Sequence, residues 1–155
     1  MKKVKIGDFV VLDPNTYCGL CRFCRRGMVH LCENLINFGV RVNGGFAEYL
    51  VAEETYIYPL SKKINLEEAA LTEPLSCCIH GIDLASIEWT DYVVILGAGT
   101  VGLIMSQLVK LKGAAKLVVV EPIRKRRELA QRLGADFVLD PSKEDILRSI
   151  PQILG

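Results

Sequence analysis

The spacing of apolar positions changes along the chain, and from Tyr92 onwards it alternates between two regular patterns. Short continuous apolar runs are typical of strands buried on both faces of a parallel sheet, and they occur at 92–96, 117–120 and 137–139. Between these runs, apolar residues recur at helical intervals and predict helices over 101–112 and 126–133, which end at Gly113 and Gly134. This β-α-β-α-β order predicts the first half of a doubly wound parallel sheet.

The N-terminal portion has a different character, with short β patterns and glycine turns. A strand is predicted over 8–13, where Pro14 ends it. A second strand is predicted over 46–51, directly after the turn at 43–45. Residues 66–71 then predict one or two helical turns. The whole chain is therefore expected to combine a β portion with an α/β portion.

A helix is predicted after these turns. Thr72 or Glu73 caps it and Pro74 takes its first position, where a missing N–H costs little. Cys77 and Cys78 fall in an apolar run of this helix, and both are predicted to be small buried hydrophobic residues.

The first strand of the α/β portion leads into a loop with the spacing G-x-G-x-x-G, which reads Gly97-Ala98-Gly99-Thr100-Val101-Gly102. Gly97 permits a tight turn, Gly99 leaves room for a pyrophosphate, and Gly102 lets the helix pack closely on the strand. The backbone N–H groups of Thr100 and Val101 are predicted to face the anion at the start of the helix. The alternative is a tight strand–helix turn that binds no ligand.

Glu121 ends the second strand, about 20 residues after the loop, where an acidic residue binds the adenosine ribose. Its charge repels a 2′-phosphate, which favours NAD over NADP. Arg126 lies in the basic run 124–127, whose cations instead favour a 2′-phosphate. The alternative interpretation of this run is a solvated helix face.

Four cysteines have the spacing C-x2-C-x2-C-x7-C, at Cys18, Cys21, Cys24 and Cys32. Four thiolates so close in sequence can close on one tetrahedral zinc ion, in a structural rather than a catalytic site. An iron–sulfur cluster is the first alternative, although bacterial ferredoxins continue with x3-C-P after the third cysteine, unlike this chain. A disulfide framework is the second alternative and suits small secreted proteins. Arginines among the ligands would offset the negative charge of the thiolates.

The composition narrows the function classes further. The chain has 155 residues, half of them apolar, and a formal net charge of +1. This charge gives no electrostatic case for a nucleic-acid or membrane partner. The start of the chain lacks the apolar region of a signal peptide, so the expected location is the cytoplasm.

Taken together, these motifs resemble the zinc-containing medium-chain alcohol dehydrogenases, most closely their sorbitol (polyol) and threonine dehydrogenase branch. The resemblance runs from Gly7-Asp8 to about Asp145. It rests on the four-cysteine lobe and the glycine loop together with Arg25-Arg26-Gly27, Leu31-Cys32, Gly44-Gly45-Phe46-Ala47-Glu48-Tyr49, Glu73-Pro74-Leu75-Ser76 and Leu133-Gly134-Ala135-Asp136.

The resemblance implies a partial GroES-like β-barrel catalytic domain with a structural zinc lobe over 1–73, and a partial NAD-binding Rossmann domain over 74–155. It implies hydride transfer between a secondary alcohol or polyol and NAD, with a second, catalytic zinc that polarises the alcohol oxygen. Glu73 matches the position of a catalytic-zinc ligand, or of a carboxylate bonded to the metal's water; on the residues alone it is equally a helix-capping carboxylate. The zinc lobe of the family lies near subunit contacts, which implies a homo-oligomer.

The chain also departs from the family pattern. It has roughly half the usual length, and it lacks the N-terminal segment that carries a zinc-binding cysteine and a Gly-His-Glu motif. A catalytic zinc needs about three protein ligands and an open position, which Glu73 alone does not provide. We therefore expect a central fragment that is inactive alone. The alternative function is a non-catalytic zinc- and nucleotide-binding remnant or subunit-assembly module.

Overall fold

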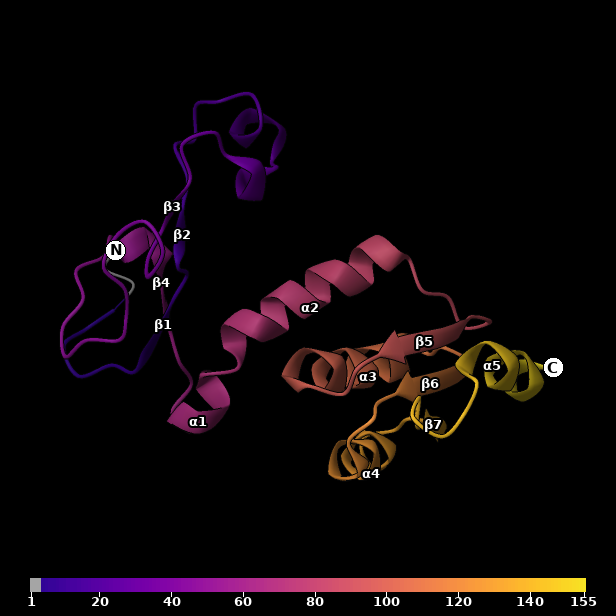
Figure 1. The fold of residues 1–155 in the computed structure, drawn as a ribbon. Helices are drawn as coiled ribbons and strands as arrows, with labels where there is room; N and C mark the ends of the chain where they lie inside the picture. Colours follow the sequence, from indigo (N-terminus) through magenta and orange to yellow (C-terminus); the bar gives the residue numbers. More distant parts are fainter. Residues whose placement is uncertain (1–3) are drawn as a thin grey trace. The chain divides into compact units, whose positions relative to one another are not determined.

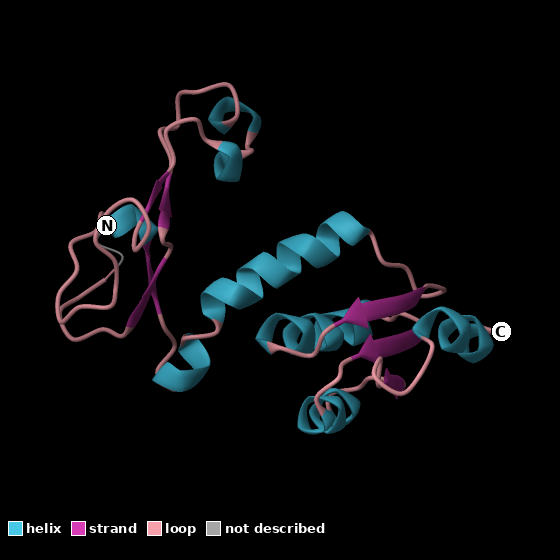
Figure 2. Ribbon diagram, viewed as in Figure 1, coloured by secondary structure: helices cyan, strands magenta, loops and turns pink. Residues whose placement is uncertain are grey.

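The computed structural model describes residues 4–155. The chain divides into two compact units, Met1–Thr72 and Glu73–Gly155 (Figure 1). Figure 2 shows that loops make up most of the first unit, whereas helices and strands make up most of the second. Each unit is described separately below.

The second unit is built on a parallel sheet of three strands in the order β5-β6-β7. The strands are β5 (Tyr92–Leu96), β6 (Lys116–Val120) and β7 (Phe137–Leu139). Helix α3 (Thr100–Lys112) connects the first two strands, and helix α4 (Arg124–Arg132) connects the second and third. The β-α-β-α-β order predicted from the sequence is therefore confirmed, with the helices beginning one or two residues earlier than predicted.

Strand β6 is buried on both faces because its side chains alternate between two apolar clusters. Leu117 and Val119 pack in one cluster together with α2, α3 and α4. Val118 and Val120 pack in the other cluster against the apolar side of helix α5 (Ile146–Leu154). The sequence did not predict α5, and this helix covers the second face of the sheet.

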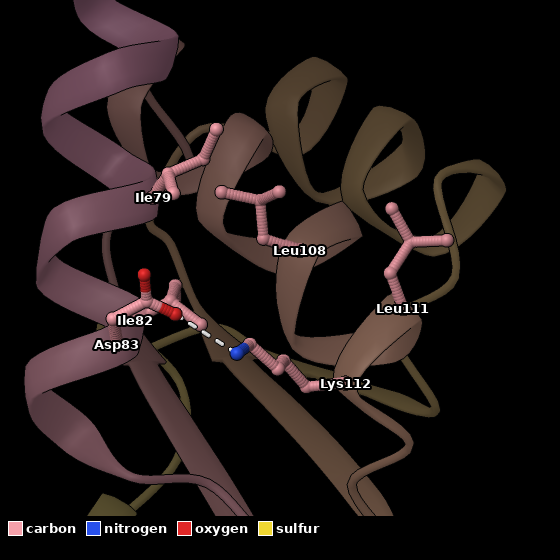
Figure 3. Close-up of a pocket in the computed structure, with 6 residues that line it drawn as sticks. All are labelled: Ile79, Ile82, Asp83, Leu108, Leu111 and Lys112. Atoms are coloured by element: carbon pink, nitrogen blue, oxygen red, sulfur yellow. Dashed lines mark hydrogen bonds and ion pairs between the residues drawn. The ribbon is translucent and has the colours of Figure 1, made fainter.

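Helix α2 (Thr72–Ala85) packs against α3 within the same unit (Figure 3). Ile79 and Ile82 of α2 and Leu108 and Leu111 of α3 line a shallow pocket of about 180 Å³ between the two helices. At the edge of the pocket the Lys112 ammonium lies 2.8 Å from the Asp83 carboxylate. This exposed ion pair orients the helices but adds little stability.

The start of α2 differs from the prediction. The helix begins at Thr72, so Pro74 is its third residue and not its first. A proline is still tolerated there because the first four N–H groups of a helix have no intrahelical partner. The prediction for the two cysteines is half right: Cys78 is 2% exposed and donates its thiol towards the Val101 carbonyl at 3.8 Å, whereas Cys77 is exposed.

The first unit contains two short antiparallel ladders. Strand β1 (Val10–Leu12) pairs with β4 (Ile57–Pro59), and β2 (Asn15–Thr16) pairs with β3 (Ile36–Asn37). Its other elements are short helical turns: η1 (Cys24–Arg26), η2 (Val29–Leu31), η3 (Glu54–Tyr56) and α1 (Leu66–Ala69). A capping box begins α1, in which the Asn65 side chain accepts from the Glu68 N–H at 2.7 Å.

The predicted strand over 46–51 is wrong. This segment forms no strand in the structure, and its aromatic residues Phe46 and Tyr49 are 113% and 89% exposed. Alternating apolar residues indicate a strand only when a neighbouring strand supplies hydrogen bonds and a face to pack on. Residues 4–155 supply no strand that pairs with this segment.

Helix lengths in the described part of the chain are modest. The 14 residues of α2 exceed those of every other helix in residues 4–155, whereas a bilayer span needs about 20 apolar residues. None of the described helices is long and apolar enough to cross a membrane.

Candidate metal and nucleotide sites

The four cysteines predicted as zinc ligands lie together in the first unit. The sulfurs of Cys18, Cys21, Cys24 and Cys32 are all within 4.8 Å of one another. The Cys21 and Cys24 sulfurs are 3.5 Å apart, and the Cys18 sulfur lies 3.6 Å from that of Cys32 and 4.0 Å from that of Cys24. All six described cysteines are free, so the structure gives no support to a disulfide framework.

These separations fit a single tetrahedral ion. Zn–S bonds of about 2.3 Å place the sulfurs of a tetrahedral site about 3.8 Å apart. An iron–sulfur cluster would hold its four ligand sulfurs farther apart, because each thiolate then binds a different iron. Backbone donors also point at the sulfurs: the N–H groups of Cys18 and Asn34 both lie 3.3 Å from the Cys32 sulfur. Such donors stabilise the thiolate form that a metal requires.

The electrostatics of the cluster also favour a cation. The N–H groups of Leu20 and Cys21 are the main causes that lower the pKa of Cys18 to about 6. The N–H groups of Cys24 and Glu33 likewise lower the pKa of Cys21. In contrast, local desolvation and then the neighbouring Cys21 thiol raise the pKa of Cys24 to about 12. The sulfurs cannot all ionise together without a cation, because like charges at these distances repel.

Two short turns bring the cysteines together. Turn η1 (Cys24–Arg26) is followed by its cap residue Gly27, whose φ of 77° lies in the left-handed region that favours glycine. Turn η2 precedes Cys32, and the N–H of Cys32 bonds to the Val29 carbonyl. The Arg22 guanidinium, expected to offset thiolate charge, lies 3.1 Å from the Glu33 carboxylate on the surface.

The glycine loop of the second unit shows a different requirement at each of its glycines. Gly97 has a φ of +97°, which strains any residue with a side chain. A Cβ on Gly102 would lie 2.0 Å from the Gly97 carbonyl oxygen, so the loop and helix pack too closely for alanine. Gly99 is extended, and a Cβ there would meet no atom within 4 Å. No contact within residues 4–155 requires glycine at position 99, whereas a bound pyrophosphate would.

The start of α3 is open to an anion. Gly99 caps the helix and provides no side-chain acceptor for the N–H groups of the first turn. The N–H groups of Thr100 and Val101 belong to this turn and have no partner within the helix. Because the helix dipole also favours negative charge at this end, the loop has the properties of a phosphate site.

Glu121 connects the end of β6 to this loop and is 3% exposed. Its Oε2 accepts from the Ala98 N–H at 2.7 Å, and its Oε1 accepts from the Ile123 N–H at 2.9 Å. Burial by itself raises the pKa of Glu121, but these two N–H groups and the Arg126 charge outweigh it and lower the pKa. The carboxylate is therefore charged, and each oxygen keeps a second lone pair for a ligand.

The basic run 124–127 contains side chains in different environments. Arg124 is 85% exposed and pairs with Glu128, as expected of a solvated helix face. Arg126 is 51% exposed and lies 4.0 Å from Glu121 Oε2. Arg127 is only 13% exposed and pairs with Asp140 at 2.9 Å. The solvated-face interpretation is therefore wrong for Arg127.

Asp140 is a second buried carboxylate at this end of the sheet, directly after β7, and the sequence identified it only as the end of a strand. Its Oδ1 accepts from the Ser142 hydroxyl at 2.6 Å and from the Ser142 N–H at 3.1 Å. The Ser142 hydroxyl is the main cause that lowers the pKa of Asp140, and the Arg127 charge contributes. The Asp-Pro-Ser sequence was the available signal, because aspartate often accepts from the backbone two residues on.

Glu73 lies on the surface in the first turn of α2. Its Oε1 accepts from the Cys77 thiol at 3.5 Å. Within residues 4–155 the four cysteines are the only group of three or more metal-ligating side chains, and Glu73 is not part of it. The described residues alone therefore do not build a catalytic zinc site around Glu73.

Comparisons with known proteins agree with this combination of sites. The family model "Alcohol dehydrogenase GroES-like domain" matches residues 1–62, and the family model "Zinc-binding dehydrogenase" matches residues 100–155. The chain is 38% identical to an L-threonine 3-dehydrogenase of Caldanaerobacter subterraneus subsp. tengcongensis over 147 residues, which is 95% of this chain and 42% of the relative. It is 37% identical to a D-arabitol-phosphate dehydrogenase of Enterococcus avium over 156 residues, which is 97% of this chain and 44% of the relative.

A solved structure gives the same result for the fold. A Sinorhizobium meliloti protein described as a zinc-binding dehydrogenase, solved with NADP bound, matches with a TM-score of 0.90 and 36% identity. The match covers 95% of this chain and 43% of that protein. The chain thus spans less than half the length of these relatives. The two family models, the relatives and the shared fold show that the chain belongs to the zinc-containing medium-chain alcohol dehydrogenase family.

Proposed function

We propose that this chain is the structural-zinc and dinucleotide-binding part of a zinc-dependent, NAD-linked alcohol or polyol dehydrogenase. The observation that carries the proposal is the pairing of a four-sulfur cluster with a glycine loop in which Gly99 has no structural reason to be glycine. The relatives that match are dehydrogenases of threonine and of a polyol phosphate, which supports a small alcohol substrate.

The domain organisation follows from the same proposal. Residues 1–73 are assigned to a partial GroES-like catalytic domain that carries the zinc lobe, and residues 74–155 to a partial NAD-binding domain. The compact units divide one residue earlier, between Thr72 and Glu73, and the matched ranges 1–62 and 100–155 fall on either side of that division. Cys18, Cys21, Cys24 and Cys32 hold the structural zinc.

The residues of the second unit would act on the cofactor. The N–H groups of Thr100 and Val101 bind the pyrophosphate, and Gly99 lets it approach. Glu121 accepts from the ribose hydroxyls through its second lone pairs. Arg126, half exposed beside Glu121, contributes a positive charge near the ribose. The cofactor, held by these residues at its pyrophosphate and ribose, would supply the hydride acceptor of the reaction.

Glu73 is proposed as a ligand or water-holding carboxylate of a catalytic zinc in the complete enzyme. That zinc would polarise the alcohol oxygen and lower its pKa, so that the alcohol loses its proton near neutral pH. We expect no turnover by the 155-residue chain alone, because the described residues place no group of three metal-ligating side chains around Glu73.

The proposal is tested by metal analysis of the purified chain, combined with NADH and NADPH titrations followed by nicotinamide fluorescence. We expect one zinc per chain and NADH bound at least about ten-fold more tightly than NADPH, because the Glu121 carboxylate repels a 2′-phosphate. Glu121→Ser should remove most of that preference, since Arg126 would then face the phosphate without a competing anion. Zinc without nucleotide binding, or equal affinity for both cofactors, would contradict the NAD assignment.

A second candidate function is a non-catalytic zinc- and nucleotide-binding module. Within the described residues Glu73 belongs to no group of three metal-ligating side chains, which favours this module. The two functions are distinguished on the full-length protein, where a second zinc per chain that is lost in Glu73→Ala and kept in Cys77→Ser would support the dehydrogenase over this module.

We also propose that the protein forms a homo-oligomer and is located in the cytoplasm. The oligomer is supported by the family resemblance of the zinc lobe, and the location by the similarity to dehydrogenases of small molecules such as L-threonine 3-dehydrogenase. Light scattering of the purified chain and cell fractionation test the two proposals separately.

A further inference from the structure

A line of hydrogen bonds crosses all three strands of the second unit at their carboxyl ends. It begins at the Ala98 N–H in the glycine loop after β5, which donates to the Glu121 carboxylate after β6. The Glu121 carbonyl then accepts from Arg127 Nη1 at 2.6 Å. Arg127 Nη2 lies 2.9 Å from Asp140 Oδ2 after β7. Arg127 therefore adds a side-chain link between the second and third strand ends, beside the backbone bond from the Glu121 N–H to the Leu139 carbonyl at 3.0 Å.

The geometry of Arg127 suits this link. Its guanidinium is planar and presents donors in a fixed fork, so one group reaches a carbonyl and a carboxylate at the same time. The side chains of Arg127 and Asp140 are 13% and 9% exposed. At this burial the ion pair is shielded from solvent. The Arg127 and Asp140 side chains are therefore held in place relative to each other more firmly than those of the exposed Arg124–Glu128 pair.

The position of the link matters because of where a dinucleotide would lie. In open α/β sheets the ligand occupies the crevice outside the carboxyl ends of the strands. The pyrophosphate takes the glycine loop after β5, and the ribose takes Glu121 after β6. The base leaves the ribose on the side away from the phosphate, which in the order β5-β6-β7 is the side of β7 and Asp140.

We propose that Arg127 is a positioning residue for the adenosine half of the cofactor. It does not touch the pyrophosphate loop, and it acts through the Glu121 backbone and the Asp140 side chain. Its role is to hold the Asp140 side chain beside the end of β6, since the backbone bond from the Glu121 N–H to the Leu139 carbonyl ties the strands together but leaves that side chain free to turn. This inference rests on the proposed dinucleotide function.

Loss of Arg127 has a defined structural effect. The Glu121 carbonyl loses its side-chain donor, and among residues 4–155 Asp140 keeps Lys143 as its charged partner, which is 3.9 Å away and exposed. Asp140 also keeps its bonds to Ser142, so the turn after β7 persists. The backbone bond from the Glu121 N–H to the Leu139 carbonyl, at 3.0 Å, also persists, and only the tie from the Asp140 side chain to β6 is lost. The glycine loop should keep its conformation, because the hydrogen bond from the Ala98 N–H to the Glu121 carboxylate does not involve Arg127.

The test compares two ligands on the 155-residue chain by isothermal titration calorimetry. ADP-ribose contains the pyrophosphate and the adenosine, whereas inorganic pyrophosphate probes the glycine loop alone. Arg127→Met should weaken ADP-ribose about ten-fold, the loss typical of one charge-assisted hydrogen bond, and change pyrophosphate affinity less than two-fold. A general loosening of the unit would weaken both ligands equally, and this result would overturn the inference.

Two further variants complete the test. Arg124→Met removes an exposed arginine from the same helix and should leave both affinities unchanged. Asp140→Asn keeps the size and the Ser142 contacts but removes the charge that faces Arg127, and should weaken ADP-ribose about three-fold to ten-fold. If Arg127→Met does not fold, Asp140→Asn decides, and unchanged ADP-ribose affinity in that variant rejects the proposal.

The outcomes separate this inference from the proposed function. If the unaltered chain binds neither ligand, the dinucleotide function fails and Arg127 has no positioning role. If the unaltered chain binds ADP-ribose and Arg127→Met binds it equally well, the dinucleotide function stands and only the role of Arg127 is rejected.

Discussion

The first unit keeps large apolar side chains such as Phe46, Tyr49 and Val51 at the surface, whereas the second unit buries Leu117, Val118 and Val119 completely. The first unit has two- and three-residue ladders, and four sulfurs lie together at one of its loops. The second unit has a three-stranded sheet with apolar clusters on both faces. The cysteine lobe is therefore expected to need a ligand in order to fold, while the sheet is held by its own core.

The largest expected effect concerns metal removal. Cys24→Ser, or a strong chelator, should unfold the lobe over residues 17–35, because a structural zinc supplies on the order of 10 kcal/mol of apparent binding free energy. The sheet of the second unit should remain intact. Amide hydrogen exchange checks this by loss of protection confined to the lobe.

Cys77→Ser is the matched control, since Cys77 is exposed and lies outside the cluster. It should keep the full zinc content. Loss of protection throughout the second unit after chelation would show that the two units do not differ in the way described.

The second effect concerns the close packing of the glycine loop. Gly102→Ala places a Cβ 2.0 Å from the Gly97 carbonyl oxygen, where backbone must shift to make room. We expect the second unit to lose about 3 kcal/mol of unfolding free energy, at the upper end of overpacking costs. Urea denaturation followed by circular dichroism measures the change, and zinc content should stay constant.

Gly99→Ala should have a smaller effect on stability and a larger one on the ligand. A Cβ at this position meets no atom within 4 Å, so the unfolding free energy should change by less than about 0.5 kcal/mol. NADH affinity should fall about ten-fold or more, because the methyl group occupies the approach of the pyrophosphate. Unchanged NADH affinity would show that this loop is only a strand–helix turn.

The smallest expected effect concerns the unfolding free energy of the second unit at low pH. Burial raises the pKa of Asp136, but the Lys110 ammonium and the Leu117 N–H outweigh it, and the net pKa is lowered, as it is for Glu121. Carboxyl groups with lowered pKa in the folded state bind fewer protons than in the unfolded chain, so stability is full above about pH 5 and falls as pH drops below about 4. Urea titrations at several pH values measure this slope.

Asp136→Asn should flatten the slope, whereas Glu128→Gln, on the surface of α4, should leave it unchanged. If the unfolding free energy depends on pH equally in the unaltered chain and in both variants, the loss of stability in acid arises from groups other than Asp136.

Sequence reasoning was most accurate where the relevant contacts are local or periodic. Strands β5 and β7 have the predicted limits, because continuous apolar runs bounded by turn residues mark strands buried on two faces. The four cysteines were recognisable because ligands a few residues apart can close on one ion without knowledge of the rest of the fold.

Prediction from the sequence failed where contacts with residues distant in the chain determine the local structure. The segment 46–51 has a strand pattern but no described strand beside it, and Cys77 lies one residue from buried Cys78 yet points outward on the helix. Helix α5 was missed because its apolar side becomes meaningful only against Val118 and Val120.

The sequence by itself determined the grouping of the four cysteines, the glycine spacing and the order of strands and helices, since each of these is set by residues close together in the chain. Only the tertiary structure decided that Arg127 is buried between Glu121 and Asp140, while Arg124 in the same basic run is exposed. The physical reason is that burial and charge pairing depend on which strand ends lie side by side. The basic run 124–127 does not by itself indicate which of its arginines will face those strand ends.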